Sequence, residues 1–176
     1  MERIYPRFIV IHHTAGFDSS ALTIDGYHRA RGFGVEVSSP AGLVKEYVKR
    51  GFKKTRSGVM VSIGYHYLIR AAGDVEKGRP DFVRGAHCTA LGMNFKSIGI
   101  ALTGNFDSVD NPDGRKGHKA PTSAQISSLR ALLAHLVKIY QIPESCILRH
   151  KDVKGAATRC PGDRFWLGPG NYGILT

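Results

Sequence analysis

The most regular hydrophobic pattern in the chain begins after Thr122. Apolar side chains then recur at spacings of three and one, which keeps them on one face of a helix. These positions are Ile126, Leu129, Leu132, Leu133, Leu136, Val137 and Tyr140. Thr122 and Gln125 have the spacing of a capping box, and Pro143 follows the last apolar position. The pattern therefore predicts a long amphipathic helix between Thr122 and Pro143.

Shorter apolar runs predict three strands. They cover residues 8–12, 63–70 and 98–102, and each is rich in β-branched or aromatic side chains. The run 98–102 has almost no polar residue, so we expect it at the centre of a sheet. Residues 71–74 have the composition of a turn, which makes the segment 65–78 resemble a hairpin.

The first predicted strand leads into two adjacent histidines. Side chains alternate between the two faces of a strand, so His12 shares a face with Phe8 and Val10, and His13 lies on the other face. Only one of the two imidazoles can therefore face a given site. The period alone does not decide which one does.

The remaining segments predict two shorter helices and a long loop. Thr23 is a candidate N-cap for a helix over Ile24–Arg31, with Gly32 as its stop. Pro40 is suited to open a short helix that contains Leu43, Val44, Tyr47 and Val48. Residues 105–119 are rich in Asp, Asn, Gly and Pro and predict a loop. The expected fold is α/β, with a central mixed β-sheet flanked by helices.

Composition indicates a globular chain with a basic surface. The 176 residues are 42% hydrophobic and carry a net charge of +11, so we expect one domain over 1–176. The charge favours a polyanionic partner such as nucleic acid, an anionic membrane surface or an acidic envelope polymer, and the basic segment 45–56 is a candidate contact with an anionic envelope. The alternative is an ordinary solvated surface. No reading helix or aromatic RNA motif is recognisable, so we expect no nucleic-acid partner.

Cysteine usage and the N-terminus indicate where the chain is made. Cys88, Cys146 and Cys160 are too few and odd in number for a disulfide framework. No long apolar run follows Met1, so we expect no signal peptide and no membrane-spanning helix. The expectation is synthesis in a reducing cytoplasm and a monomeric state.

Three distant positions offer the donors of a metal site. His12, His150 and Cys160 would supply two imidazoles and one thiolate, which leaves a fourth position on a zinc ion for water. The small residues 154–158 between His150 and Cys160 can loop back and bring both donors to one point. Spacing alone leaves the alternatives open, because His150 can cap a strand and Cys160 can be a buried thiol.

Five motifs in fixed order carry a resemblance to a known family. They are IVIHHTA at 9–15, IGYHYLIRAAGDVEKGRP at 63–80, SIGIALTGNF at 97–106, PTSAQ at 121–125 and LRHKDVKGAATRCPG at 148–162. The chain resembles the zinc-dependent N-acetylmuramoyl-L-alanine amidases shared by phage endolysins and peptidoglycan recognition proteins. The resemblance covers a core of about 8–166. It implies peptidoglycan as substrate, an amidase / peptidoglycan recognition protein-like fold, and one Zn²⁺ per chain.

The resemblance also assigns roles to individual residues. It implies His12, His150 and Cys160 as zinc ligands, and Tyr65 and Thr158 as catalytic donors to the oxyanion. The alternatives are a packing role for Tyr65 and a turn hydroxyl for Thr158 that bonds local backbone. We also expect His87 and Arg159 to contact substrate. A further possibility is that His87 and its neighbour Cys88 form a rival metal pair.

Two positions depart from parts of the family. Thr158 replaces the lysine of some phage relatives, and Arg159 is expected to point elsewhere. Ala101 stands where the cytoplasmic muropeptide-recycling amidases carry a glutamate, so no carboxylate base is evident there. This difference favours the endolysin and recognition-protein branch.

The other histidines and Cys146 are expected to be structural. His66 alternates away from Tyr65, His28 and His135 lie in predicted helices, and Cys146 is expected to be buried. Three functions remain for comparison: an endolysin-type amidase that causes host-cell lysis, a binding-only module of the same fold, and a nucleic-acid-binding protein. Binding-only relatives commonly lack the thiol that Cys160 supplies, which favours the enzyme. Such an enzyme would need release across the inner membrane to reach the wall.

Overall fold

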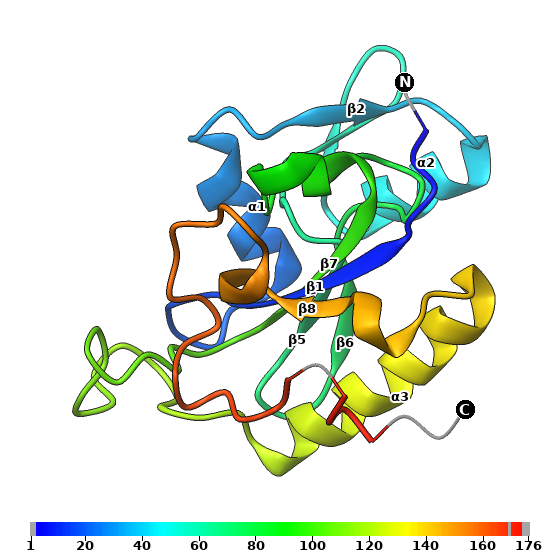
Figure 1. The fold of residues 1–176 in the computed structure, drawn as a ribbon. Helices are drawn as coiled ribbons and strands as arrows, with labels where there is room; N and C mark the ends of the chain where they lie inside the picture. Colours follow the sequence, from blue (N-terminus) through cyan, green and yellow to red (C-terminus); the bar gives the residue numbers. More distant parts are fainter. Residues whose placement is uncertain (1–2, 169, 174–176) are drawn as a thin grey trace.

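A mixed sheet of five strands forms the centre of the molecule (Figure 1). The computed structural model describes residues 3–168 and 170–173. The strand order is β6-β5-β7-β1-β8. The strands are β1 (Phe8–His13), β5 (Tyr67–Ile69), β6 (Val75–Lys77), β7 (Ser97–Leu102) and β8 (Ile147–Arg149). All neighbouring pairs are parallel except β5 with β6, which confirms the predicted mixed sheet.

Strand β7 lies in the middle of this sheet, as its apolar sequence predicted. All six of its residues are buried, and it pairs with β1 on one side and β5 on the other. The prediction of a strand over 63–70 was wrong in extent, because β5 covers Tyr67–Ile69 alone. Residues 63–66 are largely buried, but their backbone bonds mainly to loops rather than to a strand. The predicted hairpin with β6 is confirmed.

One face of the sheet is covered by α3 (Ser123–Tyr140), the helix that the hydrophobic pattern predicted. Its capping box is formed: Gln125 N donates to the Thr122 hydroxyl at 3.0 Å, and Thr122 N donates to the Gln125 side chain at 3.1 Å. Apolar residues of α3 pack on the sheet face that presents Ile9 and Ile11. The fully buried members from the helix are Leu129, Leu133 and Leu136.

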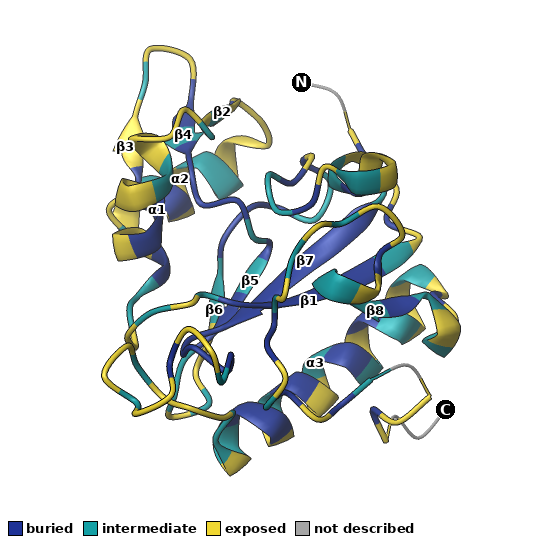
Figure 2. Ribbon diagram, turned by 60° about the vertical axis from the view of Figure 1, so that its left-hand side comes forward, coloured by how far each residue is buried: buried dark blue, intermediate teal, exposed yellow. Residues whose placement is uncertain are grey.

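The opposite side carries α1 (Ala21–Arg29), α2 (Ala41–Lys49) and a small antiparallel sheet (Figure 2). That sheet has the order β2-β4-β3, with β2 at Val35–Val37, β3 at Lys53–Lys54 and β4 at Val59–Val61. It was not predicted. The predicted helix after Pro40 is confirmed, and its Tyr47 is fully buried.

Two expectations about α1 were wrong. The helix starts at Ala21 instead of Ile24, and its N-cap is Ser20 instead of Thr23. The Ser20 hydroxyl accepts a hydrogen bond from Thr23 N at 3.1 Å. It ends at Arg29 instead of Arg31. Ser20 and Thr23 are both residue types that suit an N-cap. Ser20 takes this place, and its hydroxyl satisfies an N–H of the first turn that has no partner within the helix.

The remaining predictions concern loops and cysteines. Residues 105–119 contain no helix or strand, which confirms the predicted loop. All three cysteines are free thiols, but Cys146 is only half-buried, so the expectation of a buried thiol was wrong. Within the described residues, no helix has the length and apolarity needed to cross a membrane.

Candidate metal centre

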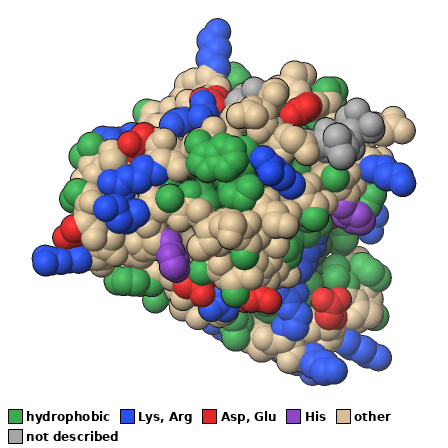
Figure 3. Space-filling view, turned by 90° about the horizontal axis from the view of Figure 1, so that it is seen from below, with side chains coloured by type: hydrophobic (Ala, Val, Ile, Leu, Met, Phe, Trp, Pro, Cys, Tyr) green, Lys and Arg blue, Asp and Glu red, His purple; other side chains and the backbone are tan. Residues whose placement is uncertain are grey.

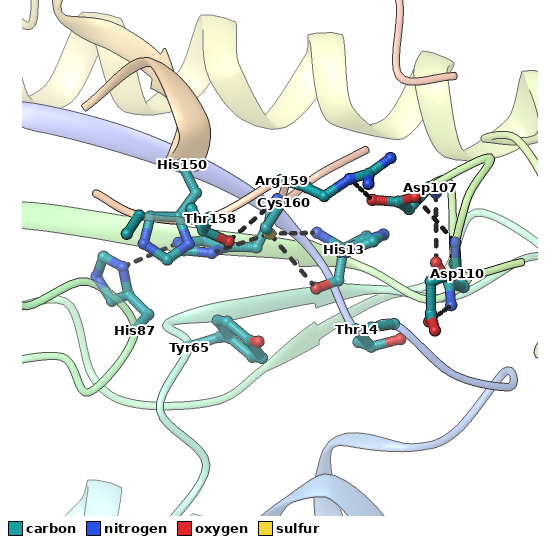
Figure 4. Close-up of a pocket in the computed structure, with 14 residues that line it drawn as sticks. His13, Thr14, Tyr65, His87, Asp107, Asp110, His150, Thr158, Arg159 and Cys160 are labelled. Carbon is teal, nitrogen blue, oxygen red and sulfur yellow. Dashed lines mark hydrogen bonds and ion pairs between the residues drawn. The ribbon is translucent and has the colours of Figure 1, made fainter. Parts of the chain in front are cut away.

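Three donor atoms from distant parts of the chain converge beside the end of β1. One ligand atom each from His12, His150 and Cys160 lies within 4.8 Å of the others. His12 belongs to β1, and His150 directly follows β8, the parallel neighbour of β1. Because parallel strands end at the same edge of a sheet, both imidazoles reach one point. The structure therefore brings together the three residues that were predicted as metal ligands, of which His150 and Cys160 are labelled in Figure 4.

Cys160 is held in place by the backbone around it. Its sulfur lies 3.6 Å from Nδ1 of His12 and accepts a hydrogen bond from His13 N at 3.4 Å. Lys151 N donates to the Cys160 carbonyl at 2.8 Å, which closes the loop between the two ligands. Gly162 follows with φ +98°, and a side chain there would overlap the backbone of Phe106. The local sequence thus forces the thiol toward His12.

The electrostatic environment disfavours charge on the donors unless a cation is present. Burial, together with the neighbouring His87 and His150, holds the pKa of His12 well below its usual value. Burial likewise lowers the pKa of His150 and raises the pKa of the Cys160 thiol to about 12. Neutral imidazoles are the form that binds metal, and a divalent cation would favour the thiolate. A set of two nitrogens and one sulfur suits zinc.

The donors lie in the wall of an open pocket of about 680 Å³. All seven predicted site residues line it: Tyr65, His87 and Arg159 together with His12, His150, Thr158 and Cys160. His12 is buried, whereas His150 and Cys160 are half-buried and connect the cluster to the pocket. The arrangement therefore fits a metal with one open coordination position, which is the pattern of catalytic zinc.

Tyr65 lies beside the donors from the segment that precedes β5. Its ring is 5.3 Å from the ring of His12 and 5.5 Å from that of His28. Burial raises the pKa of Tyr65 above its ordinary value, so the phenol keeps its proton and can donate a hydrogen bond. His28 itself accepts a hydrogen bond from Gly64 N at 2.9 Å, a structural role of the kind predicted for it.

Thr158 and Arg159 differ in how they meet the pocket. The Thr158 hydroxyl accepts a hydrogen bond from Cys160 N at 3.2 Å, which is the local turn contact considered as the alternative to catalysis. Arg159 forms an ion pair with Asp107 at 2.6 Å and is 59% exposed. This pairing directs the guanidinium along the rim of the pocket, as its expected divergence from the donors implied.

Three other histidines lie outside the donor cluster. His13 accepts a hydrogen bond from Phe106 N at 3.0 Å, and His66 is fully buried and accepts one from Gly99 N at 2.9 Å. His135 is exposed on α3. Within the described residues, the donor cluster contains neither His87 nor Cys88, so the rival metal pair finds no support.

Sequence reasoning missed the far end of the pocket. Asn105, Asp107 and Asp110 line it from the loop 105–119, which had been interpreted only as a connection. The clustering of acidic and amide side chains in that loop was the available signal. Ala101 is buried and lies in register with His12, so this part of the site carries no carboxylate.

Comparison with known proteins identifies the family. A family model described as N-acetylmuramoyl-L-alanine amidase matches residues 2–163. The chain therefore belongs to the N-acetylmuramoyl-L-alanine amidase family, and the predicted family and enzyme class are confirmed.

Individual relatives come from phages, animals and bacteria. The endolysin of Enterobacteria phage T3 is 39% identical over 110 residues, which cover 60% of this chain and 65% of the endolysin. Peptidoglycan-recognition protein SC2 of Drosophila melanogaster is 32% identical over 163 residues, covering 92% of this chain and 71% of that protein. Among solved structures, the N-acetylmuramoyl-L-alanine amidase LysC from Clostridium intestinale URNW has a TM-score of 0.65 at 32% identity, covering 94% of this chain and 82% of LysC. The predicted fold is confirmed.

Proposed function

We propose that this chain uses one zinc ion to hydrolyse the amide bond between N-acetylmuramic acid and L-alanine in peptidoglycan, and that it acts as an endolysin. The observation that carries the proposal is the convergence of His12, His150 and Cys160 within 4.8 Å in the wall of an open pocket. The names of the related endolysins support the lytic role, and the family description supports the bond.

The residues that line the pocket would have different chemical roles. A zinc ion held by His12, His150 and Cys160 would supply Lewis acidity and lower the pKa of water to about 7. The protonated phenol of Tyr65 is the first candidate donor to the oxyanion that forms at the substrate carbonyl. Thr158 can also donate, because its oxygen accepts from Cys160 N and its own proton remains available. We assign a weaker role to Thr158, since its hydroxyl already organises the turn.

The decisive experiment combines metal analysis with identification of the bond cleaved. Purified protein is treated with a chelator, reconstituted with zinc and assayed on peptidoglycan for free N-terminal L-alanine. We expect one zinc per chain, loss of activity with chelator and recovery with zinc. Cys160→Ser should lose both zinc and activity, whereas the matched control Cys146→Ser should keep both, because Cys146 lies outside the donor cluster. New reducing sugar ends, or full activity in metal-free protein, would refute the proposal.

The basic segment 45–56 supports a second contact, with the anionic bacterial envelope. Lys45, Lys49, Lys53, Lys54 and Arg56 are exposed, and the ion pairs found among the described residues include none of them. Arg50 is not part of this surface, because it donates to the Lys77 carbonyl and lies over the rings of Tyr47 and Phe52. On the face seen from below the view of Figure 1, basic side chains stand among acidic and neutral ones (Figure 3).

Removal of these charges separates envelope attraction from catalysis. A variant with Lys49, Lys53 and Lys54 changed to Gln should lyse whole cells more slowly, most clearly at low salt, and should cleave purified wall normally. The control variant loses the same number of charges at other exposed positions, Arg7, Lys119 and Lys138. Equal lysis by the two variants at low and high salt would exclude a specific role for the segment.

The cellular setting follows from the proposed role. We propose that residues 1–176 act as a single domain and a monomer, that the chain is made in the host cytoplasm, and that it reaches the wall after release across the inner membrane. Light scattering and fractionation of expressing cells before and after membrane permeabilisation test these points. A stable dimer, or protein found outside intact cells, would contradict them.

A further inference from the structure

His87 lies against one of the proposed metal ligands. Its Nδ1 is 3.0 Å from Nε2 of His12, and the two rings meet edge to face with centroids 5.0 Å apart. The other nitrogen of His12, Nδ1, is the one that faces the sulfur of Cys160 at 3.6 Å. The two nitrogens of His12 therefore have separate neighbours: one faces the donor cluster and the other faces His87.

The nitrogen of His12 that faces the donor cluster determines where the protons lie along this contact. A ring nitrogen that binds a metal carries no proton, so a neutral His12 with Nδ1 toward the cluster is protonated at Nε2. That N–H then donates to Nδ1 of His87, which leaves the proton of His87 on Nε2. The neighbour of that atom is the hydroxyl oxygen of Ser97 at 3.5 Å, and the Ser97 hydroxyl donates to the Met93 carbonyl at 2.7 Å. Each donor in this series of contacts, from His12 to the Met93 carbonyl, therefore has an acceptor.

The backbone leaves a fitted space for the His87 ring. A Cβ added to either Gly85 or Gly99 would overlap the imidazole, so both positions must lack a side chain for the ring to lie where it does. The Asn94 side chain accepts a hydrogen bond from His87 N at 2.8 Å and fixes the start of the side chain. His66 packs edge to face on the same ring at 5.7 Å. The orientation of His87 is therefore determined by the fold.

We propose that His87 is a positioning residue that keeps Nδ1 of His12 directed at the metal and so increases the affinity of the centre for zinc. The inference rests on the proposed metal function. It gives His87 a role that requires no contact with substrate. Partners that orient a ligating imidazole through its second nitrogen typically change metal affinity by about 10–100-fold when they are removed.

Two substitutions of His87 separate positioning from packing. His87→Leu and His87→Asn both remove the ring from its space between the glycines, but Asn retains an acceptor oxygen near the place of Nδ1. We expect His87→Leu to bind zinc about 10–100-fold more weakly than the wild type and His87→Asn to recover most of that loss. Competition with a chromophoric chelator measures the affinity, and thermal unfolding of the metal-free proteins measures the packing cost, which should be similar for both.

The hydrogen bond itself has a spectroscopic signature. In ¹⁵N-labelled protein without metal, we expect a proton on Nε2 of His12 and a ¹⁵N–¹⁵N coupling to Nδ1 of His87 across the hydrogen bond. Equal zinc affinity of His87→Leu and the wild type, equal weakening in both variants, or a His12 protonated at Nδ1 would overturn the inference alone. Failure of the wild type to bind zinc would instead overturn the proposed metal centre, and this inference with it.

Discussion

Replacement of the buried Arg79 by Met should destabilise the fold and loosen the loop that carries Phe33, a residue lining a second pocket beside Tyr65. Arg79 is 1% exposed, and its guanidinium donates to three carbonyls from separate loops. The acceptors are Ile63 at 2.7 Å, Arg84 at 2.6 Å and Phe33. Burial lowers the pKa of Arg79 to about 10, so it remains charged at neutral pH. Met fills a similar volume but leaves all three carbonyls without this donor.

The size of the effect follows from the burial of each hydrogen bond. A buried carbonyl that loses its partner costs about 1–3 kcal/mol, and this range applies fully to Ile63, whose bond is buried. The bonds to Arg84 and Phe33 are partly exposed, so water can replace the donor and the cost is nearer about 1 kcal/mol each. The total is about 3–5 kcal/mol, which corresponds to a fall of about 6–20 °C in Tm for a chain of this size.

Urea unfolding and thermal melting followed by circular dichroism measure this loss. Arg84→Met is the matched control, because that exposed side chain should change the free energy of unfolding by no more than about 0.5 kcal/mol. Phe33 borders a pocket beside Tyr65, so KM for peptidoglycan should rise in Arg79→Met while zinc content is kept. A loss below about 1 kcal/mol would show that the three carbonyls find other partners and would refute the reasoning.

Three other predictions test the fold and the site. The Asp18 carboxylate accepts two hydrogen bonds from Arg70, which hold its pKa well below the usual value. Asp18→Asn should therefore cost about 1–2 kcal/mol at pH 7 in urea unfolding, and the difference from wild type should shrink below about pH 4; a difference independent of pH would contradict this. Thr122→Ala should cost about 1–2 kcal/mol through loss of the helix cap, and Ser123→Ala, at an exposed neighbour, is the control that should change little. Tyr65→Phe should lower kcat by about 10²–10³ with unchanged zinc content, and a loss under about tenfold would remove Tyr65 from the oxyanion site.

The sequence predicts those elements whose signals are local. The capping box and the apolar spacing of α3 lie within the helix, and the unbroken apolar run of β7 reflects burial on both faces. The strand predicted over 63–70 was too long because the backbone of residues 63–66 bonds mainly to loop residues and to side chains of α1, and an apolar run does not reveal such partners. Strands of two or three residues, as in the small sheet, are too short to show alternation.

The site depends on contacts that no local pattern reveals. Strand alternation placed His12 and His13 on opposite faces but did not choose between them, and the resemblance to a family made the choice. Neither strand alternation nor the resemblance predicted the contact of His87 with His12. The roles of Gly85 and Gly99 are visible only when the fold brings both backbones against one ring.

The three proposed ligands lie in segments that differ in how strongly backbone hydrogen bonds hold them. His12 belongs to a strand that is hydrogen-bonded on both sides. His150 and Cys160 lie instead in a segment that starts with a single 3-10 turn, His150–Asp152, and is held together by bonds from Lys151 to the Cys160 and Gly162 carbonyls. Opening of that segment alone would withdraw two ligands and leave the sheet intact. Exchange of the ion with solution should then be faster than global unfolding. Chelators should remove the ion while the circular dichroism spectrum of the protein still reports a native sheet.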